Sequence, residues 1–339
     1  MNFEDVINLT NLYKSGKKCC NGVRWKTSTQ NFECNLMRNV VQIYDQIIAG
    51  KYKSMGFHKF TINERGKKRN IESVHITERM VQKCLCDYYL LPRFIPTFIH
   101  DNGACLKGKG TGFAIKRIKT HLHRYLIEQG NNEGYILLFD IRDFFNSINH
   151  EILLNLVRHK IEDDRIYKLY AYFINCFGGE KGLGLGSQVS QVSASIYLSV
   201  LDHFIKDKLR MKYYGRYMDD GYIICNSKEK LKSILEQIRT VLSTLKLELS
   251  EKKTHIIQLK HGFKFLKRRF IIHDNLKIVV KPNKNNIQRY KVKYKKLKLK
   301  KVSYIILENL TKTFRGYLKE FNYFDRYTRK LEEKYEIYS

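Results

Sequence analysis

The order of predicted strands and helices between residues 134 and 273 constrains the fold of this chain more than any other feature. A short apolar run opened by Gly134 predicts a buried strand over 134–141. The pattern then predicts helices over 149–160, 163–177 and 190–210, a tight hairpin over 213–225, a helix over 228–245 and strands within 254–273. This β-α-β-β-α-β order is the split βαβ arrangement, so we predict an α+β fold.

The predicted hairpin brings acidic residues together. We expect Asp219-Asp220-Gly221 at its turn, because Asp-Gly favours tight two-residue turns. The split arrangement sets the first strand beside the hairpin, so Asp140 can approach Asp219 and Asp220 although they are distant in sequence. An isolated Asp-Asp-Gly is usually only a turn, and the convergence with Asp140 is what suggests a site.

Three carboxylates at one place repel each other unless cations lie between them. Mg²⁺ is a hard ion that takes oxygen ligands and substrate phosphates. Two such ions about 4 Å apart stabilise the attacking and leaving oxygens of a phosphoryl transfer. We therefore predict that Asp140, Asp219 and Asp220 hold two Mg²⁺ ions, for which Mn²⁺ is a substitute.

The net charge indicates a polyanionic partner. It is +30, from 63 Lys and Arg against 33 Asp and Glu, and nucleic acid is the partner that such charge usually serves. Residues 281–301 contain ten Lys and Arg and no acid. Apolar residues recur there at helical spacing, which predicts a helix that packs by one face and lays its lysines along a nucleic-acid backbone. These apolar positions are Ile287, Tyr290, Tyr294 and Leu297.

Cysteine usage and hydropathy predict a cytoplasmic protein with reduced thiols and no membrane partner. The eight Cys show no CxxC spacing, the N-terminus is acidic, and no apolar run is long enough to cross a bilayer. Cys19, Cys20 and Cys34 leave open a metal site completed by a distant His, although structural zinc sites usually show tighter spacing.

Residues 57–72 predict a basic hairpin that turns at Arg65-Gly66. Helices are predicted over 36–50 and over 77–91, the latter beginning at a Thr77 N-cap.

Several motifs, in order, resemble those of reverse transcriptases. Tyr217-Met218-Asp219-Asp220 resembles the YxDD signature, and FDIRDFFNSI over 139–148 resembles motif A. GLGLGSQVSQ over 182–191 resembles motif B, LSEKKT over 249–254 resembles motif D, and GFKFL over 262–266 resembles the primer-grip region. The resemblance covers roughly residues 36–325.

The resemblance implies an RNA-directed DNA polymerase that extends a primer 3′-hydroxyl with dNTPs by two-metal phosphoryl transfer. It implies a right-hand polymerase fold with fingers and N-terminal region over 1–133, a palm with the split sheet over 134–273 and a basic helical thumb over 274–339. The implied partners are an RNA template, for which a structured non-coding RNA is one form, and a DNA or RNA primer. The resemblance leaves open whether an accessory protein or a second copy of the chain is a further partner.

The resemblance also assigns roles near the metals. Asp140, Asp219 and Asp220 would be the ligands, with Ile141 beside them at the metal and the nucleotide. Lys253, with Lys252 as the alternative, would stand near the leaving pyrophosphate as a proton donor or charge stabiliser.

Other residues would contact the incoming nucleotide. Phe145 would crowd a ribose 2′-hydroxyl and so favour dNTPs, and Phe144 would be a core residue because neighbours on a strand face opposite ways. Arg69 and Arg79 would hold the triphosphate through bidentate contacts. Leu185 and Gln191 of the motif B stretch would also meet the nucleotide.

Two departures refine the resemblance. Many relatives have Gln where this chain has Leu185, and the aliphatic residue is similar to reverse transcriptases of diversity-generating retroelements and of anti-phage defence. Lys267 stands where a Gly usually follows Phe-Leu, which puts the primer-grip geometry in question. Template-independent or protein-primed DNA synthesis and a non-catalytic nucleic-acid-binding scaffold are the rival functions. The intact carboxylate triad disfavours the scaffold.

Overall fold

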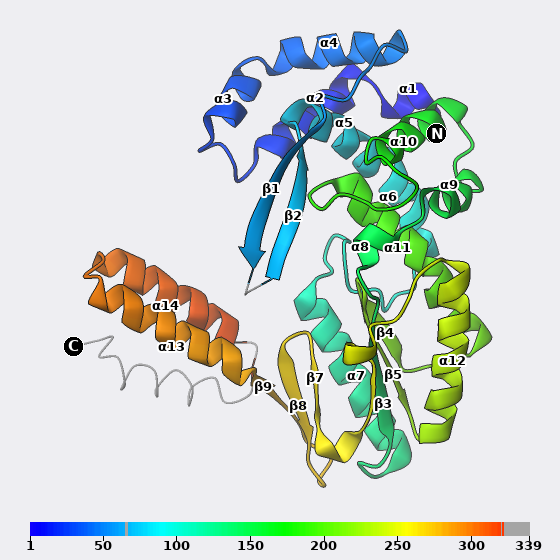
Figure 1. The fold of residues 1–339 in the computed structure, drawn as a ribbon, viewed down its shortest axis with the longest axis vertical. Coiled ribbons are helices and arrows are strands. Elements are labelled where there is room, and N and C mark those ends of the chain that lie inside the picture. Colours follow the sequence, from blue (N-terminus) through cyan, green and yellow to red (C-terminus); the bar gives the residue numbers. More distant parts are fainter. Residues whose placement is uncertain (65–66, 320, 322–339) are drawn as a thin grey trace. The chain divides into compact units, whose positions relative to one another are not determined.

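The computed structural model describes residues 1–64, 67–319 and 321, which divide into two compact units (Figure 1). The first unit comprises residues 1–107, 141–210 and 236–250, and the second comprises 108–140, 211–235 and the chain from Glu251 onward. The proposed boundaries of fingers, palm and thumb stay predictions.

A four-stranded sheet in the second unit confirms the predicted split arrangement. Its strands lie in the order β4-β5-β3-β6, and every neighbouring pair is antiparallel. Their bounds are β3 Tyr135–Asp140, β4 Tyr214–Tyr217, β5 Asp220–Cys225 and β6 His255–Gln258, with α12 (Lys228–Thr244) between β5 and β6. The first and third strands of the motif are therefore neighbours, and Asp140 lies directly opposite Asp220 in the register.

The turn of the hairpin differs from the prediction. Tyr217 pairs with Asp220, so the two turn residues are Met218 and Asp219, and Asp220 and Gly221 belong to β5. Met218 takes the left-handed backbone conformation at φ 53°. The Asp-Gly interpretation was wrong because Gly221 serves packing: a Cβ there would lie 2.2 Å from Cζ of Phe139, the residue opposite it in the register.

The remaining elements of the second unit share one apolar core with the sheet. They are α7 Thr111–Gln129, β7 Phe263–Phe265, β8 Arg268–Ile272, β9 Ile278–Pro282, α13 Lys284–Leu299 and α14 Tyr304–Leu318. Strands β7, β8 and β9 form a second, antiparallel sheet.

The basic helix forms as the sequence predicts, with a later start. β9 runs through Pro282, and the side chain of Asn283 caps α13. Tyr290 and Tyr294 are buried, and Tyr290 stacks on Phe314 of α14 with ring centroids 4.0 Å apart. The predicted packing face is thus confirmed, and most of the lysines of α13 remain exposed.

The first unit is mainly helical and carries a hairpin of β1 and β2 (Figure 1). Its elements are α1 Phe3–Val6, α2 Leu9–Cys20, α3 Thr27–Cys34, α4 Leu36–Ile48, β1 Phe57–Glu64, β2 Lys67–Val74, α5 Ile76–Leu85, α6 Leu91–Phe94, α8 Phe144–Ser147, α9 His150–Arg158, α10 Asp164–Asn175 and α11 Gln188–His203, with π-helical turns at Cys86–Leu90 and Phe204–Lys208. The predicted basic hairpin is confirmed, and its turn at Arg65-Gly66 lies outside the described residues.

Two helix starts in the first unit differ from the prediction. The cap of α5 is His75, whose Nδ1 accepts a hydrogen bond from the Thr77 amide, so the predicted Thr77 N-cap was wrong. α11 begins two residues before Ser190 because the side chain of Ser187 caps it. In both places a polar residue just outside the apolar pattern sets the boundary. No helix of the described ranges is long and apolar enough to cross a membrane.

The β7–β8 turn keeps its geometry without the usual Gly. Phe265 pairs with Arg268, so Leu266 and Lys267 form a two-residue turn, and both take positive φ (44° and 63°). Residues with a Cβ are strained there, since the left-handed region costs roughly 1–2 kcal/mol for most side chains. Gly suits this conformation, and the chain accepts the strain at Lys267.

We expect Lys267→Gly to raise the free energy of unfolding by about 0.5–1 kcal/mol, because Gly relieves the positive-φ strain. Urea denaturation of the two proteins measures the difference. Gly110, which is extended at φ −178°, provides the opposite comparison, since Gly110→Lys should bring no such gain. An unchanged or lower midpoint for Lys267→Gly would contradict the strain at this turn.

Candidate active site

Three carboxylates meet at one end of the four-stranded sheet of the second unit. Asp140 ends β3, Asp219 lies in the hairpin turn, and Asp220 begins β5. One oxygen from each side chain lies within 4.8 Å of the other two, and Asp140 is buried while the other two are half-buried. The donor set contains only hard carboxylate oxygens, so it fits Mg²⁺.

The electrostatics of the triad favour a bound cation. Burial, followed by the negative charges of Asp219 and Asp140, raises the pKa of Asp220 to about 7. Burial and then the charge of Asp140 also raise the pKa of Asp219. The folded protein therefore resists holding three negative charges here, and a divalent cation removes that penalty.

Lys253 contacts the triad directly. Its Nζ lies 2.5 Å from Oδ2 of Asp140. Burial acts to lower the pKa of Lys253, but the hydrogen bond to Asp140 and its charge outweigh burial and raise the pKa. Of the two lysines that the sequence singled out, Lys253 therefore has the direct contact. A cavity of about 460 Å³ opens beside Asp220 and Lys253.

Two features that sequence reasoning missed hold the hairpin turn in place. Arg216 is 2% exposed, and its Nη1 donates a hydrogen bond to the carbonyl of Met218 at 2.8 Å. The ring of Phe139 fills the space above Gly221. The buried guanidinium and the aromatic–Gly pair fix the backbone that carries Asp219 and Asp220. The only sequence signal for Arg216 is a charged residue inside an apolar strand.

The motif A phenylalanines lie in the first unit, in the short helix α8 rather than on a strand. The argument from strand alternation was therefore wrong in its geometry. Phe144 is nonetheless buried at 3% exposure, as expected for a core residue, and Phe145 is half-buried. The backbone carbonyl of Phe145 accepts a hydrogen bond from the Leu183 amide at 2.8 Å. The role of Phe145 at the sugar stays a prediction.

The Gly-rich stretch of motif B is pinned to the β1–β2 hairpin within the first unit. The Glu72 amide donates to the carbonyl of Leu185 at 3.2 Å, and a Cβ at Gly186 would lie 3.4 Å from the Glu72 carbonyl. Leu185 is half-buried, and Gln191 is exposed near the start of α11. Their contacts with a nucleotide stay predictions.

The remaining predicted site residues, Arg79, Arg69 and Ile141, all belong to the first unit. Nη2 of Arg79 donates to Ser73 at 3.0 Å, and the buried Nε of Arg79 has no hydrogen-bond partner in the described chain. Arg79 lines a cavity of about 410 Å³, so it has capacity for an anion. Arg69 lies in β2 opposite Ile62, and its side chain falls outside the described residues. Ile141 is buried and pairs with Leu249. Their roles stay predictions.

The open possibility of a cysteine metal site finds no support. Within residues 1–64, 67–319 and 321, the carboxylate triad is the sole group of His, Cys, Asp or Glu with metal-binding spacing. Cys19 and Cys20 are buried and Cys34 is exposed. Burial raises the pKa of Cys19 to about 11, so its thiol stays protonated at neutral pH.

We expect Mg²⁺ to stabilise this fold more at about pH 8 than at about pH 5.5. Asp220 has a raised pKa in the folded state, so the metal-free folded chain keeps a proton that the unfolded chain releases. This group therefore lowers the free energy of unfolding as pH rises from about 4 to about 7. Mg²⁺ replaces the proton, which makes its effect largest above pH 7.

Melting temperatures with and without Mg²⁺ at the two pH values measure this effect. An excess of about 100-fold over the dissociation constant adds about 2.7 kcal/mol, which corresponds to a rise of several degrees for a chain of this size. Asp219→Asn/Asp220→Asn should abolish the rise. An equal rise at both pH values, or one that survives in the double variant, would place the ion elsewhere.

The comparisons with known proteins agree with this site. The family model described as reverse transcriptase (RNA-dependent DNA polymerase) matches residues 57–270. Protein YkfC of Escherichia coli (strain K12) is 23% identical over 274 residues, which covers 67% of this chain and 70% of that protein.

Two telomerase structures share the fold at a TM-score of 0.52. Apo telomerase from Candida tropicalis is 13% identical, with 68% of this chain and 49% of that chain covered. Telomerase from Candida albicans, in complex with the TWJ fragment of telomeric RNA, is 11% identical, with 71% and 51% covered. This chain thus spans about half the length of the telomerase chains, and the likeness shows a right-hand polymerase fold. Because the family model spans most of the chain and the motifs lie within it, this protein belongs to the reverse transcriptase (RNA-dependent DNA polymerase) family.

Proposed function

We propose that this protein extends the 3′-hydroxyl of a primer with dNTPs on an RNA template by two-metal phosphoryl transfer. The observation that carries the proposal is the convergence of Asp140, Asp219 and Asp220, with oxygens within 4.8 Å, inside a reverse transcriptase family match. A pure nucleic-acid-binding scaffold has no use for three mutually repelling carboxylates.

The residues of the chain divide the work at this site. Asp140, Asp219 and Asp220 supply the oxygen ligands. When bound, the Mg²⁺ ions supply the Lewis acidity that activates the primer hydroxyl and offsets the charge of the leaving pyrophosphate. Arg216 and Phe139 hold the ligands in place before substrate binds. Lys253 keeps its proton beside Asp140, where it can neutralise or protonate the leaving group.

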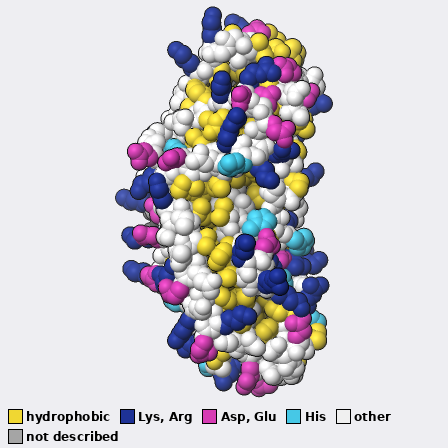
Figure 2. Space-filling view, turned by 90° about the vertical axis from the view of Figure 1, so that its right-hand side faces the viewer, with side chains coloured by type: hydrophobic (Ala, Val, Ile, Leu, Met, Phe, Trp, Pro, Cys, Tyr) yellow, Lys and Arg dark blue, Asp and Glu magenta, His cyan; other side chains and the backbone are white. Residues whose placement is uncertain are grey.

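The proposed partners follow from charge and from the relatives. Lys and Arg side chains project from many places on the face drawn in Figure 2, between apolar patches, and the net charge is +30. The albicans telomerase is described in complex with a fragment of its RNA, which supports a structured RNA as the template-bearing partner here. We propose that the fingers lie in 1–133, the palm in 134–273 and the thumb in 274–339.

The aliphatic Leu185 in the motif B stretch supports a place in a bacterial or phage retroelement or an anti-phage defence system. Template-independent or protein-primed synthesis is the rival activity at the same site, so the test of function must include reactions without template. An accessory protein or a second copy of the chain is compatible with the same site.

A DNA primer annealed to an RNA template tests the function, with dNTPs and Mg²⁺ present and with EDTA as the control. We expect the primer to lengthen to the template end with Mg²⁺ and not with EDTA. Lengthening of the primer alone would favour template-independent synthesis. If nucleotides are added to neither primer, template nor protein under any condition, the proposed synthesis is wrong and the non-catalytic nucleic-acid-binding scaffold is the function that remains.

We expect Phe145→Ala to lower the preference for dNTP over rNTP by at least about tenfold, because removing the ring opens space for a 2′-hydroxyl. The ratio of kcat/KM for the two nucleotides in single-nucleotide extension measures it. Phe98→Ala, which truncates another half-buried ring of the first unit, should leave the ratio unchanged. If Phe145→Ala also leaves it unchanged, Phe145 is only a packing residue.

A further inference from the structure

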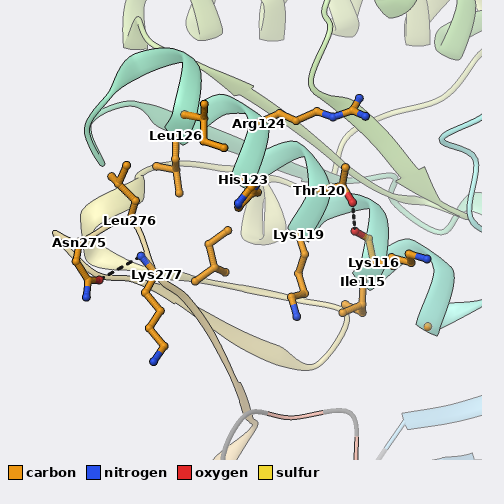
Figure 3. Close-up of a pocket in the computed structure, with 13 residues that line it drawn as sticks. Ile115, Lys116, Lys119, Thr120, His123, Arg124, Leu126, Asn275, Leu276 and Lys277 are labelled. Atoms are coloured by element: carbon orange, nitrogen blue, oxygen red, sulfur yellow. Dashed lines mark hydrogen bonds between the residues drawn. The ribbon is translucent and has the colours of Figure 1, made fainter.

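A cavity outside the carboxylate site lies between α7 and the segment that joins β8 to β9, within the second unit (Figure 3). Its volume is about 820 Å³, and no carboxylate lines it. The apolar part of the lining is aliphatic and comes from both walls, with Ile115 and Leu126 on α7 and Leu276 and Ile278 on the other side. None of these residues belongs to the triad or to the motifs of the family.

Cations surround this aliphatic lining. Lys116, Lys119 and Arg124 on α7 and Lys277 on the opposite wall line the cavity and are exposed. None of the four forms an ion pair with an acid in the described chain. Two acids are near in the chain but do not line the cavity: Glu128 pairs with Lys212 and also interacts electrostatically with Arg124, and Asp274 accepts a hydrogen bond from Asn132 at 2.9 Å. The lining itself therefore carries a net positive charge.

Two of the four cations extend to the same side of the cavity. Lys119 and Lys277 extend from opposite walls toward the same side, while Lys116 and Arg124 extend outward along the helix (Figure 3). His123 turns toward the cavity between them. A ligand suited to this arrangement has a flat apolar part for the aliphatic walls and anionic groups for the two ammonium groups.

Single-stranded RNA has this chemistry. An unstacked base presents an apolar face that aliphatic and imidazole groups can cover, and the phosphates beside it are regularly spaced anions. Lys116, Lys119 and His123 follow one face of α7 at i, i+3 and i+7, which makes a row about 10 Å long. A row of donors along one helix follows a backbone of phosphates, and the chain as a whole carries +30.

We propose that this cavity binds a single-stranded segment of RNA away from the catalytic carboxylates. We call it the α7 pocket, and its lining includes Lys116, Lys119, His123, Leu276, Lys277 and Ile278. One base enters between the aliphatic walls, and the flanking phosphates lie on Lys119 and Lys277. The inference rests on the proposed function, since RNA is the polymer that the enzyme would copy. Its consequence is a second anchor that keeps the RNA bound while the copied strand moves.

The test uses the full chain and a fluorescein-labelled, unstructured RNA of about 20 nucleotides, longer than typical single-strand site sizes. Fluorescence anisotropy over a range of salt gives affinity and salt slope. We expect Lys119→Ala/Lys277→Ala to bind at least about fivefold more weakly, with a slope smaller by about 1.4, or about 0.7 for each lost phosphate contact. Lys119→Arg/Lys277→Arg keeps both positive charges and should bind like the wild type.

The matched control removes two exposed lysines from α12, as Lys230→Ala/Lys232→Ala. Equal losses in the pocket and control variants would overturn the proposal, since only total charge would then matter. Binding of a Glu- and Leu-rich peptide that is lost in the pocket variant, while RNA binding is unchanged, would also overturn the proposal in favour of a protein partner. With 4-thiouridine in the RNA, cross-links should map to 111–129 or 275–278 and disappear in the pocket variant.

Failure of this proposal is distinguishable from failure of the proposed function. If the wild type extends primers while the pocket variant binds RNA normally, the α7 pocket is overturned and the polymerase stands. If the pocket variant loses RNA while the wild type extends no primer, the pocket is supported and the polymerase function fails. Melting curves of the variants test for unfolding, and we expect them to match the wild type because the substituted lysines are exposed.

Discussion

Asp219→Asn is expected to lower the rate of dNTP incorporation by about 10³-fold or more while RNA affinity stays within about twofold of the wild type. The amide keeps the size of the side chain but removes a negative charge that the metal ions require. RNA affinity instead depends on lysines such as those of α13, which are distant in sequence from Asp219. Single-turnover extension with saturating Mg²⁺ measures the rate, and anisotropy measures the affinity.

A matched control separates this effect from any change of fold. Asp45→Asn makes the same substitution at an exposed position of α4 and should leave both quantities unchanged. Because the pKa of Asp219 is already raised by burial and by Asp140, the Asn variant should be at least as stable as the metal-free wild type. Incorporation at the wild-type rate in Asp219→Asn would remove this residue from the metal site.

Gly221→Ala is expected to destabilise the second unit by about 3 kcal/mol and to abolish extension. The added Cβ would lie 2.2 Å from Cζ of Phe139, whose side chain is 2% exposed and has little room to move. β5 would have to shift, and it carries Asp220. Urea denaturation gives the free energy of unfolding, and primer extension gives the activity.

Two further variants isolate the cause of the Gly221→Ala effect. Phe139→Leu removes the part of the ring that meets the new Cβ, so Phe139→Leu/Gly221→Ala should be less destabilised than the two single changes together, by about 1 kcal/mol or more. Gly316→Ala, in α14 where a Cβ meets nothing within 4 Å, should be neutral or stabilising. Strict additivity of the two substitutions would show that the ring is not what requires Gly221.

The strands and the acidic triad were predictable because their signals are local. A short apolar run that ends in Asp140 reads as a buried strand, and the split βαβ order then brings Asp219 and Asp220 to it. The basic helix was equally clear, since Tyr290 and Tyr294 repeat at helical spacing and are buried in the structure.

The turn at Met218-Asp219 was not predictable because its causes lie in tertiary packing. Asp-Gly is a strong turn signal, but it acts through positive φ, and in this hairpin Met218 takes the positive φ instead. The buried Arg216 binds the Met218 carbonyl, and Phe139 on a neighbouring strand requires Gly221. Local turn preference was therefore outweighed by two contacts that only the folded sheet creates.

Two helix starts and the α7 pocket could not be predicted from the sequence, for related reasons. Thr77 and His75 both offer a capping group, and only the local backbone decides between them. The pocket joins α7 to residues 275–278, which are far apart in the sequence. Nothing in either segment alone distinguishes its lysines from the many other lysines of the chain.

Single-nucleotide extension on four RNA templates that differ only in the next template base tests whether this carboxylate site carries out RNA-templated DNA synthesis. With a DNA primer, Mg²⁺ and all four dNTPs supplied separately, we expect the wild type to add chiefly the complementary dNTP on each template and Asp219→Asn to add none. Addition of the same nucleotide whatever the template base, or addition that persists in Asp219→Asn, would contradict RNA-templated synthesis at this carboxylate site.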